Sequence, residues 1–264
     1  MRPLASLLRQ QRLWLVLALA AIVALAWAYV WQGVGMGMPA SDMTAALLFP
    51  HRAAETPGSM VVAWPLLLSM WWMMMVAMMA PAALPLLLLY RRAVLHHAPC
   101  GSVAAISLAG LLLGYLASWG AFAVLATVAQ GLLQPAGLLS GAMWWSRSRV
   151  FSAALLIVAG VYQWTPLKNR CLNHCRDPVR FLVDSRAGPG FAAALRLGLR
   201  HGAYCVGCCG PLMALLFVGG VMNLLWMAAL CVLVLFEKLL PQGPRVARGL
   251  GVALVSWGMA TLLV

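Results

Sequence analysis

Charged residues are scarce in this sequence, and acidic ones are nearly absent. Only 9% of its 264 residues are charged, with five Asp and Glu in all, whereas 64% are hydrophobic. A soluble domain carries about a quarter charged residues. No soluble fold could bury so much apolar surface, so the composition predicts a polytopic membrane protein. The net charge of +13 is spread between apolar segments. It forms no long basic block, which argues against nucleic-acid binding.

Several signatures of catalysis and transport are also missing. The sequence contains no GxSxG, Walker A, HExxH or CxxCH motif, so no hydrolase, ATPase, zinc protease or c-type haem site is indicated. It has no internal repeat of the kind that marks a two-halved transporter. The chain is therefore not a primary pump by itself.

Long apolar runs predict an all-α bundle of about seven transmembrane helices, or six if Gly219-Gly220 does not separate two of them. Ala26-Trp27-Ala28 resembles a signal-peptidase site, but the run continues to Trp31, which favours an uncleaved span. Pro81 and Pro85 should kink the second span. We expect a single membrane domain over 1–264, with a metal-binding core at 61–241. The predicted spans are 13–31, 61–90, 103–130, 150–164, 202–219, 222–240 and 246–264.

The distribution of positive charge predicts the orientation. With the N-terminus inside, 15 of the 18 Lys and Arg residues fall in cytoplasmic segments, as the positive-inside rule requires. The polar segment 165–201 is then cytoplasmic. It should hold two short amphipathic helices, one between Thr165-Pro166 and Pro178 and one at 190–200. The expected location is the bacterial inner membrane.

In this orientation, cysteine and methionine are distributed differently between the two sides of the membrane. The predicted external segments have no cysteine but carry Met36, Met38, Met43 and Met60, whereas the cytoplasmic side is rich in cysteine and histidine. Cytoplasmic thiols stay reduced, so a disulfide framework is not expected. Thiolate and thioether ligands suit Cu(I), and Zn²⁺ is the alternative.

Two cysteine clusters have helical spacing. Cys205, Cys208 and Cys209 share one face, which continues to Met213, and Pro211 should interrupt the helix there. The cluster indicates metal or redox chemistry, and the alternative is that these cysteines are simply small buried apolar residues. The second cluster, on the short cytoplasmic helix, consists of Cys171, His174 and Cys175. It supplies three ligands and needs a fourth from elsewhere, such as His201 or Cys100.

A methionine row occupies the second span. Met74, Met75, Met78 and Met79 lie on adjacent stripes and either fill gaps in the packing or contact metal. Glu237 and Lys238 should form an interfacial ion pair, Gln163 should lie in the interfacial belt, and Asn223 should be a helix cap or a ligand. The proposed site brings the four methionines to Cys205, Cys208, Cys209 and Met213.

Five stretches resemble a bacterial family of predicted metal-binding integral membrane proteins. They are AMMAP (77–81), YQWTPLKNRCLNHCRDP (162–178), GCCGPLM (207–213), VMN (221–223) and EKLLP (237–241). The resemblance covers about 64–241 and implies metal binding without naming the metal. Gly210 stands where that family usually has an aromatic residue after the paired cysteines.

Three functions fit these observations. The favoured one is a soft-metal-binding membrane protein that acts in uptake, delivery or metalloprotein assembly, with Cu(I) as the cargo. A metallochaperone or metalloprotein would be its partner, beside the lipid bilayer. The alternatives are a membrane thiol-disulfide oxidoreductase that uses Cys205, Cys208 and Cys209, and a structural assembly subunit without metal.

Overall fold

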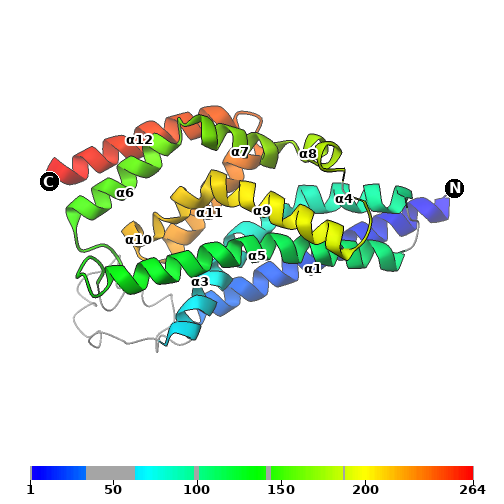
Figure 1. Ribbon diagram of the computed structural model, residues 1–264, viewed down its shortest axis with the longest axis horizontal. Coiled ribbons are helices and arrows are strands. Elements are labelled where there is room, and N and C mark those ends of the chain that lie inside the picture. Colours follow the sequence, from blue (N-terminus) through cyan, green and yellow to red (C-terminus); the bar gives the residue numbers. More distant parts are fainter. Residues whose placement is uncertain (1, 34–62, 98–100, 141–143, 187, 264) are drawn as a thin grey trace.

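The computed structural model describes residues 2–33, 63–97, 101–140, 144–186 and 188–263, and these form a bundle of α-helices (Figure 1). Five helical segments of the described chain are long and apolar enough to cross a membrane, or six if the bent pair α6 (Arg149–Tyr162) and α7 (Pro166–Arg176) counts as one span. The predicted all-α membrane bundle is confirmed. The predicted sixth span is α11 (Leu224–Leu239), which at 16 residues is only about 24 Å long.

The first three predicted spans are helical. They correspond to α1 (Arg2–Trp31), to α3 (Trp64–Met79) with α4 (Leu84–His97), and to α5 (Gly101–Leu133). Pro81 lies in a short 3₁₀ turn, Ala80–Ala83, that joins α3 to α4, and Pro85 lies in the first turn of α4. The 3₁₀ turn accommodates the missing backbone donor, and Trp64–His96 remains one candidate span.

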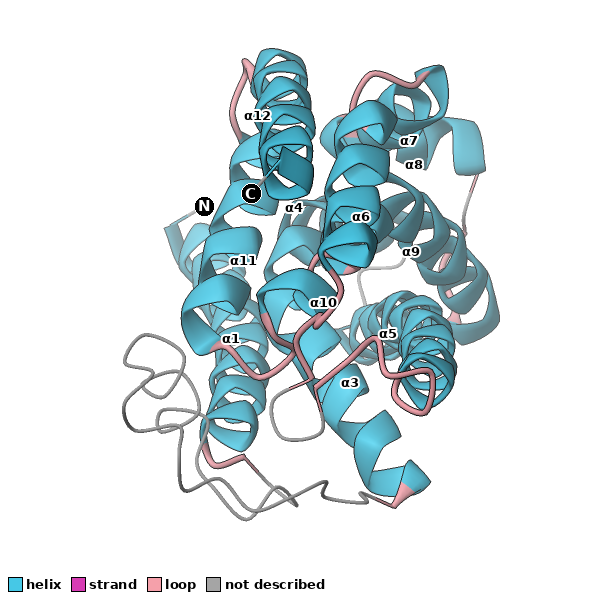
Figure 2. Ribbon diagram, turned by 90° about the vertical axis from the view of Figure 1, so that its left-hand side faces the viewer, coloured by secondary structure: helices cyan, strands magenta, loops and turns pink. Residues whose placement is uncertain are grey.

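Helices α5 and α9 (Phe191–Met213) form the closest helix pair (Figure 1). Glycines make this contact possible. A Cβ atom at Gly114 would lie 2.2 Å from the Leu195 carbonyl oxygen, and one at Gly198 would lie 2.1 Å from the Leu111 carbonyl oxygen. Small residues of this kind let helix backbones approach closely in membranes. Figure 2 shows α9 and α11 between α6 and α12 (Gly243–Leu263) on one side and α1, α3 and α5 on the other.

Helix α9 corrects two expectations. The predicted separate helix at 190–200 is its first half, and Pro211 does not interrupt it, because the helix continues to Met213. Proline leaves the carbonyl four residues earlier without its helical donor. That carbonyl, of Gly207, accepts a hydrogen bond of 2.6 Å from the Tyr162 hydroxyl instead. The chain bends only later, after α10 (Leu216–Gly219), where Gly220 has a φ of 92°.

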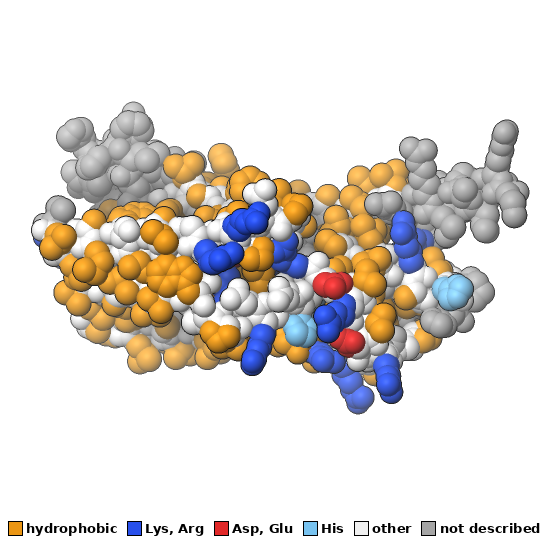
Figure 3. Space-filling model, turned by 90° about the horizontal axis from the view of Figure 1, so that it is seen from above, with side chains coloured by type: hydrophobic (Ala, Val, Ile, Leu, Met, Phe, Trp, Pro, Cys, Tyr) orange, Lys and Arg blue, Asp and Glu red, His pale blue; other side chains and the backbone are white. Residues whose placement is uncertain are grey.

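The predicted boundaries of the first short helix in the polar segment are confirmed. Thr165 caps α7 by accepting a hydrogen bond from the Lys168 amide, and Pro178 opens a new helix, α8 (Pro178–Ser185). Asn223 is the N-cap of α11, since its side chain accepts from the Trp226 amide. Figure 3 shows basic side chains gathered over α7 and α8, while the neighbouring surface toward the chain's C-terminus is mainly apolar.

Candidate metal centre

The three cysteines of α9 are fully buried on one face of the helix, as their spacing predicts. The sulfur atoms of Cys208 and Cys209 lie 3.1 Å apart, and the Cys208 thiol donates to the Cys205 carbonyl at 3.2 Å. Met213 is buried one turn further along. A row of free thiols therefore faces the interior of the bundle.

Helix α7 brings a fourth thiol to this row. The Cys175 sulfur lies 3.8 Å from the Cys208 sulfur. Gly207 allows this approach, because the Cys171 sulfur would lie only 2.9 Å from a Cβ atom at that position. The two cysteine clusters that the sequence suggests are therefore in contact. We refer to Cys175, Cys205, Cys208 and Cys209 as the thiol cluster.

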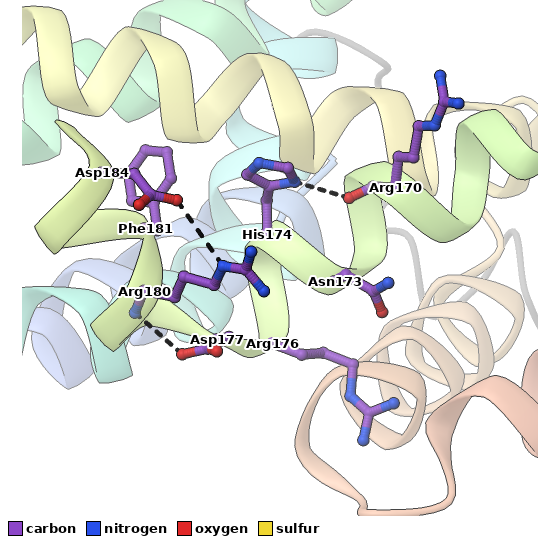
Figure 4. Close-up of a pocket in the computed structure, with 8 residues that line it drawn as sticks. All are labelled: Arg170, Asn173, His174, Arg176, Asp177, Arg180, Phe181 and Asp184. Carbon is purple, nitrogen blue, oxygen red and sulfur yellow. Dashed lines mark hydrogen bonds and ion pairs between the residues drawn. The ribbon is translucent and has the colours of Figure 1, made fainter.

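His174 does not face the thiol cluster. Its ring stacks on Tyr204, with the ring centroids 4.3 Å apart, and its Nδ1 atom lies 2.8 Å from the Arg170 carbonyl oxygen. It lines a pocket of about 490 Å³ on the polar face of α7 and α8 (Figure 4). The other lining residues are Arg170, Asn173, Arg176, Asp177, Arg180, Phe181 and Asp184. The structure thus separates His174 from the thiols with which it was predicted to act.

The thiol cluster is not a preformed cage of three or more ligands. Within the described part of the chain, no three side chains among His, Cys, Asp and Glu are arranged to hold a metal ion. His201, the suggested fourth ligand, is buried and has its ring 5.8 Å from that of Tyr115. Cys100 and the predicted external residues Met36, Met38, Met43, His51 and Met60 lie outside the described residues.

A lysine ammonium group lies against the thiols. Lys238 Nζ donates to the Cys205 sulfur at 2.7 Å. The Tyr115 hydroxyl lies 3.1 Å from the same sulfur and donates to the Met79 carbonyl at 2.8 Å. Cys205 is therefore surrounded by polar partners at the centre of the bundle.

The prediction of an interfacial Glu237–Lys238 ion pair is wrong. Glu237 is fully buried and binds Lys168, with 2.8 Å between Oε2 and Nζ, while Lys238 turns to Cys205. Gln163 is also buried within the protein, and its Oε1 accepts a hydrogen bond from Lys168. Adjacent helix positions point in different directions, so the two charges of α11 reach α7 and α9 separately.

The methionine row is fully buried. Met74, Met75, Met78 and Met79 have no exposed side-chain surface. Backbone contacts relate the row to the cysteines: the Met79 carbonyl accepts from Tyr115, which contacts Cys205, and the Cys231 thiol donates to the Met78 carbonyl at 3.4 Å. Tyr115 therefore stands between α3 and the thiol cluster.

These features define a polytopic helical membrane protein that has four thiols at its centre, a buried lysine paired with Glu237 and a second buried lysine bound to Cys205. The chain belongs to the PpoB2 family of copper chaperones, whose family model matches residues 68–261. No curated protein and no solved structure matches it. The family confirms that the function is related to copper, as the sulfur ligands predict.

The sequence pointed to the cysteines but not to Tyr115 and Lys238 as neighbours of Cys205, nor to Lys168 and Gln163 as neighbours near Glu237. A signal for Glu237 and Lys238 was present, because this pair follows directly on the apolar run of α11. Ionisable residues within a membrane segment are functional candidates by default.

Proposed function

We propose that this protein binds Cu(I) at the thiol cluster and passes it on in copper uptake, delivery or cuproprotein assembly in the cytoplasmic membrane. The observation that carries the proposal is the contact between Cys175 of α7 and Cys208 of α9, which brings the half-buried Cys175 to the three buried thiols of α9. Thiolates select soft ions such as Cu(I), and copper agrees with the family's description.

The cargo would be held by a pair of thiolates, since no three ligands stand ready in the described residues. Cys208 is the natural centre of such a pair, because the Cys175 and Cys209 sulfurs lie within reach of its own and its thiol also contacts Cys205. Met213 and the methionine row would offer weaker thioether ligands deeper in the bundle. Cys171, which faces Gly207 of α9, and His174, on the polar face of α7, would receive or release the ion.

Elemental analysis of the detergent-purified protein, produced with copper and zinc available, tests this proposal. We expect near-stoichiometric copper in the wild type and almost none in the Cys208→Ser/Cys209→Ser variant, because the shared ligand is lost. Cys231→Ser is the matched control, as this buried thiol contacts the Met78 carbonyl instead. Copper retained by the double variant would contradict the proposal. If the protein contains zinc, and this zinc is lost only when Cys171 and Cys175 are replaced, the site is instead a zinc site on the cytoplasmic helix.

One observation also supports a thiol-disulfide oxidoreductase. The Cys175 and Cys208 sulfurs, 3.8 Å apart, need only a small movement to form a disulfide between α7 and α9. That function predicts redox-dependent trapping of both thiols by an alkylating reagent without any metal. If the alkylating reagent reacts with these two thiols only after copper has been removed, the copper-binding proposal is favoured.

A further inference from the structure

The buried ammonium group of Lys238 forms no hydrogen bond or ion pair with any carboxylate of the described chain. The residue is 8% exposed, and its Nζ atom donates to the sulfur of Cys205, which is fully buried. A buried charge needs a partner of opposite sign, because its removal from water is otherwise too costly. Lys238 therefore requires negative charge in its surroundings.

The acidic residues of the described chain are engaged elsewhere. Glu237 directs both carboxylate oxygens to Lys168, at 3.0 and 2.8 Å. Asp177 caps α8, and Asp184 pairs with Arg180 on the exposed surface. The partner that the structure gives Lys238 is thus a cysteine sulfur. Its charge is matched when Cys205 is a thiolate.

We propose that Lys238 determines the ion specificity of the thiol cluster, by making monovalent soft ions favourable and divalent ions unfavourable. This inference rests on the proposed copper function. A Cu(I) ion bound by the thiolates of Cys205 and Cys208 forms a complex with one negative charge, which the lysine beside Cys205 cancels. A divalent ion with the same two thiolates is neutral and leaves the ammonium uncompensated. A divalent ion would need a third thiolate before its complex carried the negative charge that cancels the lysine. No three His, Cys, Asp or Glu side chains of the described chain are arranged to hold a metal ion together.

Removal of the lysine charge should reverse this preference. In Lys238→Met, two thiolates balance a divalent ion and leave a Cu(I) complex with an uncompensated charge. Competition with chromophoric chelators for Cu(I) and for Zn(II), on the full chain in detergent under anaerobic conditions, measures both affinities. We expect the ratio of Cu(I) to Zn(II) affinity to fall by about 30-fold or more, the equivalent of ~2 kcal/mol for truncating one partner of a buried charge pair.

The control is Lys238→Arg, which keeps the charge and should keep most of the ratio. If Lys238→Arg lowers the ratio as much as Lys238→Met does, side-chain shape rather than charge sets the preference, and the inference fails. An unchanged ratio in Lys238→Met also overturns it. Wild-type protein that binds no Cu(I) would instead refute the proposed function.

A measurement on the unmodified protein covers the case in which Lys238→Met does not fold. Ag(I) and Cd(II) are both soft ions but differ in charge. The wild type should bind Ag(I), and Cu(I) should displace the bound Ag(I). Cd(II) should compete poorly with Cu(I) for the site. Equal competition by Ag(I) and Cd(II) would show that softness alone governs binding, and would overturn the inference.

Discussion

Replacing Glu237 with leucine is expected to destabilise the protein by about 3–5 kcal/mol, the cost of leaving one partner of a buried ion pair alone. Lys168 has no exposed side-chain surface, so its ammonium group would remain in the interior with only the Gln163 oxygen as partner. The measurement is unfolding of the purified protein in detergent, by heat and by titration with a denaturing detergent.

Two further variants show whether the loss comes from the unpaired charge. The double variant Lys168→Met/Glu237→Leu removes both charges and should recover most of the stability, since apolar side chains of similar volume can replace a buried pair. Asp184→Leu breaks the exposed pair with Arg180, which is worth at most about 1 kcal/mol. Equal losses in Glu237→Leu and Asp184→Leu would contradict the burial of Glu237.

The same ion pair should also control the geometry of the thiol cluster. Lys168 lies on the helix that carries Cys175, so loss of Glu237 should loosen α7 from α9. Mild oxidation of a chain whose other cysteines are replaced by alanine is expected to join Cys175 to Cys208 efficiently in the wild-type background. The Glu237→Leu background should reduce this yield, and the double apolar variant should restore it if packing alone positions α7.

Gly198→Leu is expected to prevent the bundle from closing, at a cost above about 4 kcal/mol. Any side chain at this position begins 2.1 Å from the Leu111 carbonyl, and a backbone atom of α5 cannot rotate aside. The variant should elute as aggregated protein in size-exclusion chromatography and lack a cooperative unfolding transition.

Gly249→Leu provides the matched control in another helix. A Cβ atom there meets no other atom within 4 Å, so the substitution should leave folding intact. A folded, monodisperse Gly198→Leu protein would show that α5 and α9 can separate without loss of structure. The close helix contact would then not be the scaffold of the thiol cluster.

The local features of the fold were predictable from the sequence because they depend on neighbours along the chain. Apolar runs predicted the helices, Thr165 predicted the cap of α7, and helical spacing placed the α9 cysteines on one face. For Asn223 the sequence left a cap and a metal ligand as alternatives, and the structure shows the cap. The effect of Pro211 was not predictable in the same way. The Gly207 carbonyl, which Pro211 leaves without a helical donor, accepts a hydrogen bond from Tyr162, 45 residues before Gly207 in the chain. This partner keeps α9 continuous.

The composition of the candidate centre depends on contacts between helices, which spacing does not specify. Cys171, His174 and Cys175 follow a ligand-like pattern, yet α7 presents Cys175 to Cys208 and His174 to Tyr204. The position of Glu237 near Pro241 suggested the membrane interface. In the folded protein, α7 packs over Glu237 and buries it, and this contact between helices could not be predicted from the sequence.

The two charges that end α11 also bear on how the protein is made. Cys175 and the three α9 thiols are synthesised before Glu237 and Lys238, which belong to the next helix along the chain. During translation the four thiols therefore precede the carboxylate that fixes α7 and the ammonium that balances Cys205. Insertion of α11 completes the centre. A nascent chain that has not reached residue 238 carries all four thiols but neither of the charged residues of α11, so the complete centre can form only in a late step of synthesis.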